Sequence, residues 1–296
     1  MTDTPLAQEL SDNTRRLSAA KDTKVLKPAK TRVFTVSNQK GGVGKTTSAV
    51  NLGAALASKG LKVLVIDLDP QGNASTALGV AHDETVQGTY EVLVERAPML
   101  KLIQRSSTFE NLYCLPATIN LAGADMELFE SFEKEQQRDR LKIGIADLLS
   151  SMSENKRPDY ILIDCPPSLG LLTVNAFVAA NEVLIPIQCE YYALEGLQQL
   201  LETIERIKSG LNPTLVVSTI LLTMFDSRTK LAGQVADEVR SYFPNETLQA
   251  VIPRAVRVSE APSFGETIMT YDKSSSGAIA YLEAAIEMAN KGANNG

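Results

Sequence analysis

Continuous apolar runs alternate with helical stretches along most of the chain. Five runs rich in β-branched and aliphatic residues predict strands: RVFTVSNQ, LKVLVIDLD, YILID, EVLIPIQ and TLVVSTILLTMFD. Because they do not alternate with polar residues, these runs are typical of strands buried on both faces, as in parallel sheets. Stretches between them, such as TTSAVNLGAALASKG and LAGQVADEVRSYF, have helical periodicity. The pattern predicts an α/β fold with a doubly wound, mostly parallel sheet and helices on both faces.

The same pattern divides the chain into three parts. Residues 32–290 are expected to form one domain, in which the segment from about 82 to 140 is mostly helical and acidic. Residues 1–31 are polar and lack aromatic residues, which predicts a flexible arm; contact with DNA or a partner is the alternative. Residues 291–296 are expected to be a disordered tail.

Composition excludes several classes of protein. The chain has 296 residues and a net charge of −6, with 44% hydrophobic residues, which excludes disordered and collagen-like chains. Neither a membrane-spanning run nor a signal core is present, so a soluble, cytoplasmic protein is expected. The three cysteines are widely spaced, which argues against structural zinc and a disulfide framework. His82 is the single histidine, so catalysis by a histidine base is not expected.

The octapeptide KGGVGKTT carries the strongest chemical signal. It fits the phosphate-loop pattern GxxxxGK followed by Ser or Thr, with the first glycine relaxed, and it lies between a predicted strand and a predicted helix. Glycines let backbone N–H groups approach phosphate oxygens, and the helix N-terminus favours anions. An ordinary glycine-rich turn is the alternative. We expect a P-loop that binds ATP with Mg²⁺ through Lys40, Gly41, Gly42, Val43, Gly44, Lys45, Thr46 and Thr47.

Individual roles follow from the chemistry of the loop. Lys45 would reach the β- and γ-phosphates, the Thr46 hydroxyl would coordinate Mg²⁺, and Thr47 would hold the α-phosphate. Lys40 is a second lysine at the start of the loop, as in the deviant Walker A pattern KGGxGKT followed by Ser or Thr. In that class this lysine resembles an arginine finger supplied across a dimer interface, where it neutralises charge that develops in phosphoryl transfer. A solvated loop lysine is the alternative.

Three acids end predicted strands. Asp67 and Asp69 follow the run LKVLVI at spacing i and i+2, so they project on one face. Asp69 could orient the attacking water, while Asp67 could contact the Mg²⁺ shell or the region of Thr46. Asp164 ends YILID and resembles a Walker B acid that holds Mg²⁺ through water. Any one of these acids could instead cap a helix or form a turn. The absence of a histidine base predicts slow hydrolysis.

These segments together resemble the ParA/Soj family of DNA-partitioning ATPases, from about residue 32 to the C-terminus. The segments that carry the resemblance include NQKGGVGKTTSAVNLGAALA, VLVIDLDPQGNAS, DYILIDCPPSLGLLTVNA, PIQCEYYALEGLQQLL and VIPRAVRVSEAPSFGETI. The resemblance implies an ATP-dependent homodimer on nonspecific double-stranded DNA, and a ParB-type partner that stimulates hydrolysis. It implies a nucleoid-associated protein in which Lys40 is the trans lysine, Asp69 the hydrolysis acid and Asp164 the Walker B acid.

The resemblance also implies residues for adenine and DNA. Met224 and Pro253 resemble the positions that flank adenine, and Ala255 replaces the Asn usual in the family motif IPRNVR. Residues 201–260 contain seven basic and seven acidic residues, so composition alone shows no basic tract. The resemblance nevertheless makes a set of cations candidates for a phosphate-binding face across the dimer: Arg228, Lys230, Arg240, Arg254 and Arg257.

Three other functions remain alternatives. A membrane-associated ATPase of the MinD type would need a basic amphipathic C-terminal helix, but Lys291 is the only base in AIAYLEAAIEMANKGANNG. An iron–sulfur ATPase of the nitrogenase-iron-protein type would need paired thiolates at a subunit interface, and Cys165 and Cys189 are its candidates. A nucleotide-binding module without hydrolysis is the third alternative.

Overall fold

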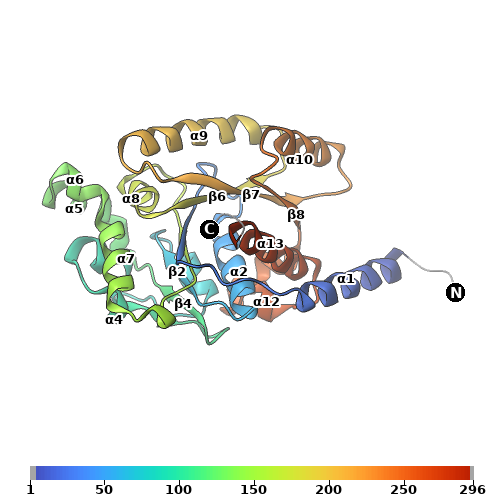
Figure 1. Ribbon diagram of the computed structural model, residues 1–296, viewed down its shortest axis with the longest axis horizontal. Coiled ribbons are helices and arrows are strands. Elements are labelled where there is room, and N and C mark those ends of the chain that lie inside the picture. Colours follow the sequence, from blue (N-terminus) through green and yellow to red (C-terminus); the bar gives the residue numbers. More distant parts are fainter. Residues whose placement is uncertain (1–4, 294–296) are drawn as a thin grey trace.

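One eight-stranded sheet forms the centre of the computed structural model, which describes residues 5–293 (Figure 1). The strand order is β3–β4–β2–β5–β1–β6–β7–β8, and all neighbouring strands are parallel except β3 and β4. The mostly parallel α/β sheet predicted from the continuous apolar runs is confirmed. The strands are β1 (Arg32–Val36), β2 (Val63–Asp67), β3 (Gln104–Arg105), β4 (Leu112–Leu115), β5 (Tyr160–Asp164), β6 (Glu182–Gln188), β7 (Val216–Phe225) and β8 (Thr247–Pro253).

Each central strand supplies side chains to two separate cores. In β5, Tyr160 and Leu162 belong to one buried cluster, whereas Ile161 and Ile163 belong to the other. Successive side chains of a strand point to opposite faces, so a strand covered on both sides must be apolar throughout. This is the physical reason that the runs are continuous rather than alternating.

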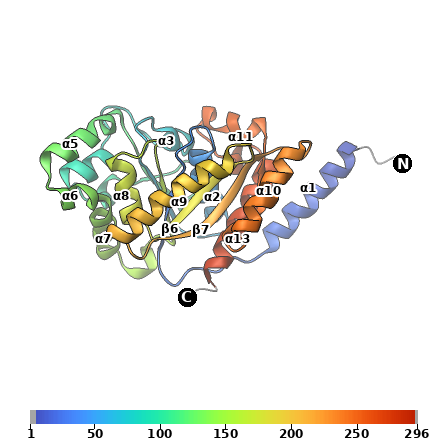
Figure 2. The same ribbon diagram turned by 90° about the horizontal axis from the view of Figure 1, so that it is seen from above.

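Helices cover both faces of the sheet (Figures 1 and 2). One face carries α7 (Arg140–Ser151), α8 (Leu171–Ala179), α9 (Ala193–Gly210) and α10 (Lys230–Tyr242). The other carries α2 (Lys45–Ser58), α3 (Asn73–Ala77), α11 (Val256–Glu260), α12 (Ile268–Tyr271) and α13 (Ser276–Ala293). Within residues 5–293, no helix has the length and apolar character needed to cross a membrane.

The segment from 82 to 140 differs from the mostly helical expectation. It contains the edge strands β3 and β4 among short helices, which are η1 (Glu91–Glu95), α4 (Met99–Leu102), η2 (Ile119–Gly123), α5 (Ala124–Ser131) and α6 (Lys134–Arg138). Two further short helices lie elsewhere, η3 (Glu154–Lys156) and η4 (Ala261–Phe264). Strand β4 has only four residues, and Tyr113 within it is exposed, so its apolar signal is short and interrupted.

The two ends of the chain also differ from expectation. Residues 5–22 form helix α1 (Pro5–Asp22) where a flexible arm is expected. The Arg16 guanidinium binds the Glu283 carboxylate of α13 through two hydrogen bonds of 3.0 and 2.6 Å, and Ala20 is buried. Helix α13 continues to Ala293, so the first residues of the expected tail are helical, and Lys291 donates to the Asn245 and Thr247 carbonyls. The rest of the tail and residues 1–4 lie outside the described residues.

Candidate functional site

The octapeptide KGGVGKTT lies between the end of β1 and the first turn of α2, at the carboxyl edge of the sheet. Gly42 and Gly44 have φ values of 74° and 88°, in the left-handed region that favours glycine. A Cβ at Gly42 would meet no atom within 4 Å, so conformation rather than space calls for glycine there. The Thr223 hydroxyl of β7 donates to the Val43 carbonyl at 2.9 Å. A neighbouring strand therefore helps to set the shape of the loop.

Lys45 is the first residue of α2, and its side chain is turned into the loop. The residue is 7% exposed, and its Nζ donates to the Lys40 carbonyl at 3.2 Å. Burial lowers the pKa of Lys45, and the nearby Asp164 carboxylate opposes this shift. A cation held at a helix N-terminus beside a glycine loop suits a phosphate group. Thr46 and Thr47 follow in the same turn and are half-buried.

Asp67 and Asp164 face each other across neighbouring strands. They are register partners at the ends of β2 and β5, and both are fully buried. Asp67 accepts hydrogen bonds from the Ser75 N–H at 2.8 Å, the Ser75 hydroxyl at 2.7 Å and the Asp69 N–H at 3.3 Å. Burial raises the pKa of Asp67 to about 6, against the effect of these bonds. Both Asp67 oxygens are thus occupied within the fold, which suits a role in holding the turn before α3 better than the expected contact with a metal shell.

Asp164 is different, because neither of its carboxylate oxygens has a hydrogen-bond partner among the described residues. Burial, and then the Asp67 carboxylate, raises its pKa well above the ordinary value. A buried carboxylate without a partner is costly unless a proton or a cation completes it. Mg²⁺ prefers oxygen ligands and usually keeps several waters. The orphaned carboxylate and the neighbouring Thr46 hydroxyl therefore fit a magnesium ion.

Asp69 lies two residues beyond β2 and remains half-exposed. Its Oδ1 accepts from the Gln71 N–H at 3.0 Å, and its carbonyl accepts from the Gly72 N–H at 2.9 Å. These bonds form the turn that leads into α3 and leave the second carboxylate oxygen without a hydrogen bond to a described residue. An accessible carboxylate on a fixed turn, close enough to Lys45 to affect its pKa, can orient a water molecule.

Lys40 occupies an open environment at the rim of the loop. Its side chain is 44% exposed, and Nζ lies 3.0 Å from Oε2 of Glu190. The Arg254 guanidinium also lies 3.9 Å from Glu190. Tyr191 and Tyr192 directly follow Glu190. They are 76% and 67% exposed, and their rings pack edge to face. Lys40 therefore lies beside exposed aromatic surface and is not directed into its own loop.

The two residues expected beside adenine lie at the ends of neighbouring strands. Met224 is near the end of β7 and Pro253 ends β8, where Phe225 and Pro253 are register partners. Both are half-buried, and Met224 has a φ of 51°, which is unusual for a residue other than glycine. Because Thr223 bonds to the phosphate loop, this strand end and the loop lie side by side. Ala255 lies at the N-cap of α11 and provides no side-chain cap.

The five cations expected on DNA are not all in one place. Arg228, Lys230 and Arg254 lie near the carboxyl edge, whereas Arg240 lies near the other end of α10 and donates to the Gln249 carbonyl at 3.1 Å. Arg240 follows Lys230 by ten residues of α10, which corresponds to about 15 Å along the helix axis. Arg228 is paired with Asp226 at 2.8 and 2.7 Å. Arg257 on α11 lies 3.3 Å from Glu260. Within the described residues, acids therefore already contact several of these cations.

Sequence reasoning missed three residues that shape the site. Ser75 holds Asp67, Thr223 holds the phosphate loop, and Glu190 holds Lys40. The spacing of Ser75 from Asp67 was a usable signal, since both belong to one strand–turn–helix unit. Thr223 and Glu190 carry no comparable signal, because they reach the loop only through the pairing of distant strands.

Comparisons with known proteins place this geometry in context. A family model described as an AAA domain matches residues 31–217. Over 261 residues the chain is 49% identical to the sporulation initiation inhibitor protein Soj of Bacillus subtilis, covering 88% of this chain and 99% of that protein. Over 258 residues it is 49% identical to the chromosome partitioning protein ParA of Myxococcus xanthus, covering 87% of each.

A solved structure has the same fold. The cobyrinic acid a,c-diamide synthase of Mycobacterium smegmatis, with a bound ATP analogue and magnesium, matches with a TM-score of 0.73 and 37% identity. The match covers 86% of this chain and 93% of that one.

Proposed function

Because this chain has an AAA domain and belongs to the family of the Soj and ParA chromosome-partitioning proteins, we propose that it is a DNA-partitioning ATPase. ATP binding brings two subunits together, the homodimer binds double-stranded DNA without sequence preference, and hydrolysis releases it. A ParB-type protein stimulates the hydrolysis. The protein is then found in the cytoplasm on the nucleoid, and its cargo is a chromosome or a plasmid.

The observation that carries this proposal is the unequal environment of two lysines on one loop. Lys45 is 7% exposed and bonded within the loop, as expected of a lysine that serves its own subunit's nucleotide. Lys40 lies at the rim with its side chain 44% exposed, next to the exposed Tyr191 and Tyr192. Exposed aromatic residues are enriched at protein interfaces. A second subunit docked on this rim would meet Lys40 directly.

The chain's own residues have distinct tasks in the proposed reaction. The Gly42–Thr47 backbone and Lys45 bind the phosphates, Thr46 and Asp164 hold Mg²⁺, and Asp69 orients water. When bound, Mg²⁺ neutralises charge on the phosphate oxygens. Lys40 supplies a second positive charge from the partner subunit. No histidine base is assigned a part, because the ring of His82, the single histidine, is bonded to the Thr76 hydroxyl of α3 at 3.0 Å.

DNA binding is proposed for cations on the loop before α10, on α10 itself, directly after β8 and on α11. Each phosphate neutralised by a cation steepens the salt dependence of binding, and a dimer doubles the number of such contacts. ATP would thus control DNA binding through dimerisation, with little change inside each subunit. The five candidates are Arg228, Lys230, Arg240, Arg254 and Arg257.

Two alternatives have less support. The apolar residues of α13 pack on α2 and β8, with Ile279 and Leu282 buried, so this face is not free for a lipid surface of the kind a MinD-type helix uses. Cys165 and Cys189 are buried, which does not suit a cluster shared between subunits. A liposome pelleting assay and a visible absorption spectrum test these alternatives.

Size-exclusion chromatography with light scattering, in ATP and in ADP, tests the proposal. We expect the wild type to dimerise only with ATP, Lys40→Ala to bind ATP without dimerising, and Lys45→Ala to bind no nucleotide. Asp69→Ala should give a long-lived dimer that retains DNA and releases no phosphate. A wild-type protein that stays monomeric with ATP, or normal phosphate release by Asp69→Ala, would contradict the proposal.

A further inference from the structure

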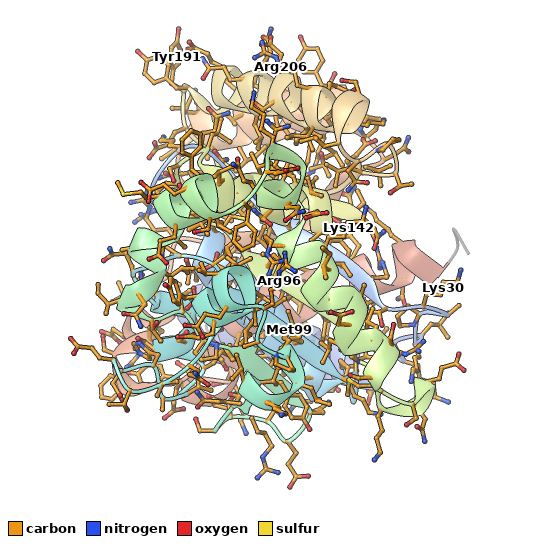
Figure 3. The ribbon with its side chains drawn as sticks, turned by 90° about the vertical axis from the view of Figure 1, so that its left-hand side faces the viewer. Lys30, Arg96, Met99, Lys142, Tyr191 and Arg206 are labelled. Carbon is orange, nitrogen blue, oxygen red and sulfur yellow. The ribbon has the colours of Figure 1, made fainter. Side chains whose placement is uncertain are left out.

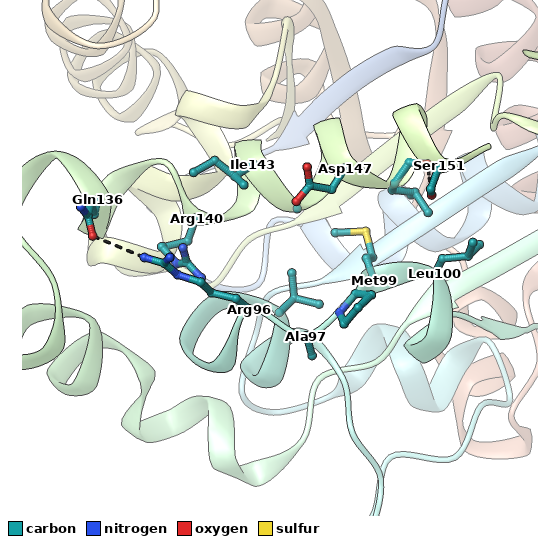
Figure 4. Close-up of a pocket in the computed structure, with 13 residues that line it drawn as sticks. Arg96, Ala97, Met99, Leu100, Gln136, Arg140, Ile143, Asp147 and Ser151 are labelled. Carbon is teal, nitrogen blue, oxygen red and sulfur yellow. Dashed lines mark hydrogen bonds between the residues drawn. The ribbon is translucent and has the colours of Figure 1, made fainter. Parts of the chain in front are cut away.

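A groove runs along helix α7, away from the phosphate loop. Its first part is a hollow of about 610 Å³ between α7 and residues 92–100, and its second part has about 360 Å³. Leu100 and Leu148 line both hollows, so the two lie next to each other along α7. Figure 3 shows the face of the molecule that carries Arg96 and Met99, and Figure 4 shows the first hollow. We call this feature the α7 groove; the residues that matter are Arg96, Met99, Leu100, Arg140, Leu148 and Met152.

One face of α7 forms a wall of the groove. Its lining residues recur at helical spacing, i, i+3, i+4, i+7, i+8 and i+11. Gly144 lies in the middle of this face, where a Cβ would be 2.8 Å from Val92 Cγ1. Glycine thus allows η1 and α7 to approach closely. The lining residues from α7 are Arg140, Ile143, Gly144, Asp147, Leu148 and Ser151.

Two arginines meet at one end of the groove, as Figure 4 shows. Arg140 is 3% exposed, and its Nε donates to the Leu93 carbonyl at 2.8 Å. Its other two nitrogens have no acceptor among the residues the structure describes. Among the described residues, the Arg96 guanidinium donates only to Gln136, at 3.4 Å. Both guanidinium groups lie over the Phe132 ring, Arg96 at 5.5 Å and Arg140 at 4.8 Å from its centre.

Two positive charges over one ring, one of them buried, repel each other. Burial and then the Arg96 charge lower the pKa of Arg140, and the Asp139 carboxylate opposes this shift without forming an ion pair. In the described part of the chain, neither guanidinium has a carboxylate within ion-pair distance. A carboxylate from outside would relieve the repulsion and could accept two hydrogen bonds in the fork geometry that arginine favours.

The opposite end of the groove is also basic, and its middle is apolar. Lys62 and Lys156 line the second hollow, and Asp147 is the single acid lining either part. This balance differs from that of the whole chain, which has a net charge of −6. Three large apolar residues at or beside the groove are partly exposed: Leu100 (48%), Ile143 (43%) and Tyr113 (36%). An apolar strip between basic ends is complementary to an apolar segment between acidic ends.

We propose that the α7 groove binds an acidic amphipathic peptide segment of a partner protein. Its apolar side chains would lie on Met99, Leu100 and Leu148, one acidic end on Arg96 and Arg140, and the other acidic end near Lys156. From Arg140 to Met152 the groove follows about 18 Å of helix, the length of a segment of about three helical turns. The half-exposed Leu100 leaves the groove open along one side, which suits a chain segment better than an enclosed small molecule. The proposal does not depend on the ATPase function.

Methionine methyl NMR tests the proposal, because the chain has seven methionines, and two of them line the groove. The probe is a synthetic helical peptide of about 14 residues with glutamates at both ends and leucines at helical spacing between them. We expect the Met99 and Met152 methyl signals to shift on titration while the Met224 and Met269 signals stay unchanged. Fluorescence anisotropy of the labelled peptide gives the Kd.

Charge variants with a matched control distinguish the groove from general charge attraction. Arg96→Glu and Lys156→Glu should each weaken binding about tenfold. Lys142→Glu makes the same change on α7 outside the lining residues and should leave the Kd unchanged. Equal binding of a peptide with lysines in place of the glutamates, or shifts spread over all methionines, would overturn the proposal. Equal shifts of Met99 and Met152 with decanoate, at similar affinity, would also overturn it and assign the groove to small amphiphilic anions.

Discussion

The ammonium group of Lys40 lies 3.0 Å from the Glu190 carboxylate of its own subunit. If Lys40 acts on a partner's nucleotide, this ion pair competes with that role. The pair is nearly half exposed, so it contributes only about 0.5 kcal/mol. We expect Glu190→Gln to strengthen ATP-dependent dimerisation two- to threefold and Lys40→Gln to abolish it. Analytical ultracentrifugation at several protein concentrations measures both effects.

Glu195→Gln is the control for this comparison, since Glu195 is an exposed acid on the first turn of α9. It should leave the dimerisation constant unchanged. Weaker dimerisation of Glu190→Gln would instead mean that Glu190 itself contacts the partner.

Asp164→Asn separates stability from magnesium binding. The substitution removes a buried carboxyl group that has no hydrogen-bond partner in the described residues and that lies opposite the Asp67 carboxyl. Without nucleotide, the variant should therefore have a melting temperature a few degrees above that of the wild type. For a chain of this size, each kcal/mol of added stability raises the melting temperature by about 2–4 °C. The further rise in melting temperature on adding ATP with Mg²⁺ should be lost. Differential scanning fluorimetry with and without Mg²⁺ shows both, and a lower melting temperature without nucleotide would contradict the first expectation.

The paired acids also predict a pH dependence. The pKa of Asp67 in the folded protein is about 6, above the ordinary value of 3.8, and the pKa of Asp164 is raised as well. A raised pKa means that the folded state holds the proton more tightly than the unfolded chain does. The contribution of Asp67 to the free energy of unfolding is thus largest below about pH 4 and is lost as the pH rises through about 6. Asp164 acts in the same direction.

Urea unfolding of the nucleotide-free protein across this range measures the effect. The loss of stability with rising pH should be smaller in Asp164→Asn and unchanged in Glu154→Gln, whose acid is exposed on η3. Identical pH profiles for all three proteins would refute the assignment to the buried pair.

Arg228 and Asp226 should have opposite effects on DNA binding. The Asp226 carboxylate holds the Arg228 guanidinium with two hydrogen bonds, and this pairing lowers the pKa of Asp226 to about 2. If Arg228 contacts phosphate, Arg228→Ala should weaken DNA binding. Asp226→Asn should strengthen DNA binding, and the slope of log K against log salt concentration should become steeper by about one per subunit. Filter binding at several salt concentrations, with ATP present, gives the slopes. Parallel losses in both variants would mean that the pair supports the loop rather than DNA.

Arg16→Ala should loosen helix α1 without affecting the nucleotide site. The Arg16–Glu283 pair has good bidentate geometry but is partly exposed, so its loss should cost about 1 kcal/mol or less. We expect faster proteolysis between residues 23 and 31 and unchanged ATP binding. Glu283→Gln should behave in the same way, whereas Arg15→Ala, which removes a pair internal to α1, should not.

The central sheet and the phosphate loop could be predicted from sequence because their signals are local. A strand buried on both faces is a continuous apolar run, and KGGVGKTT between such a run and a helix has few other interpretations. Strand β8 was not predicted, since it is an edge strand with Gln249 exposed at its centre. Its place is fixed by α13 and β7, which sequence periodicity does not reveal.

Helix α1 is a second element that could not be predicted from the sequence. Its polar sequence has little to favour a packed helix. What attaches it is the pair of Arg16 with Glu283, 267 positions away, together with the bonds from Lys59 to the Ala20 and Lys21 carbonyls. The same holds within the site. Asp67 and Asp164 end strands as expected, and Asp69 lies two residues beyond β2, but which carboxylate has free oxygens depends on Ser75 and on the register of β2 with β5.

The hydrogen bond from Thr223 to Val43 spans 180 positions of the chain. This hold on the loop can form only after β7 has entered the sheet next to β6. During synthesis on the ribosome, the octapeptide is complete long before β7 is made, so the nascent chain would lack this bond. We therefore expect tight nucleotide binding to appear late in folding, after the pairing of β6 with β7.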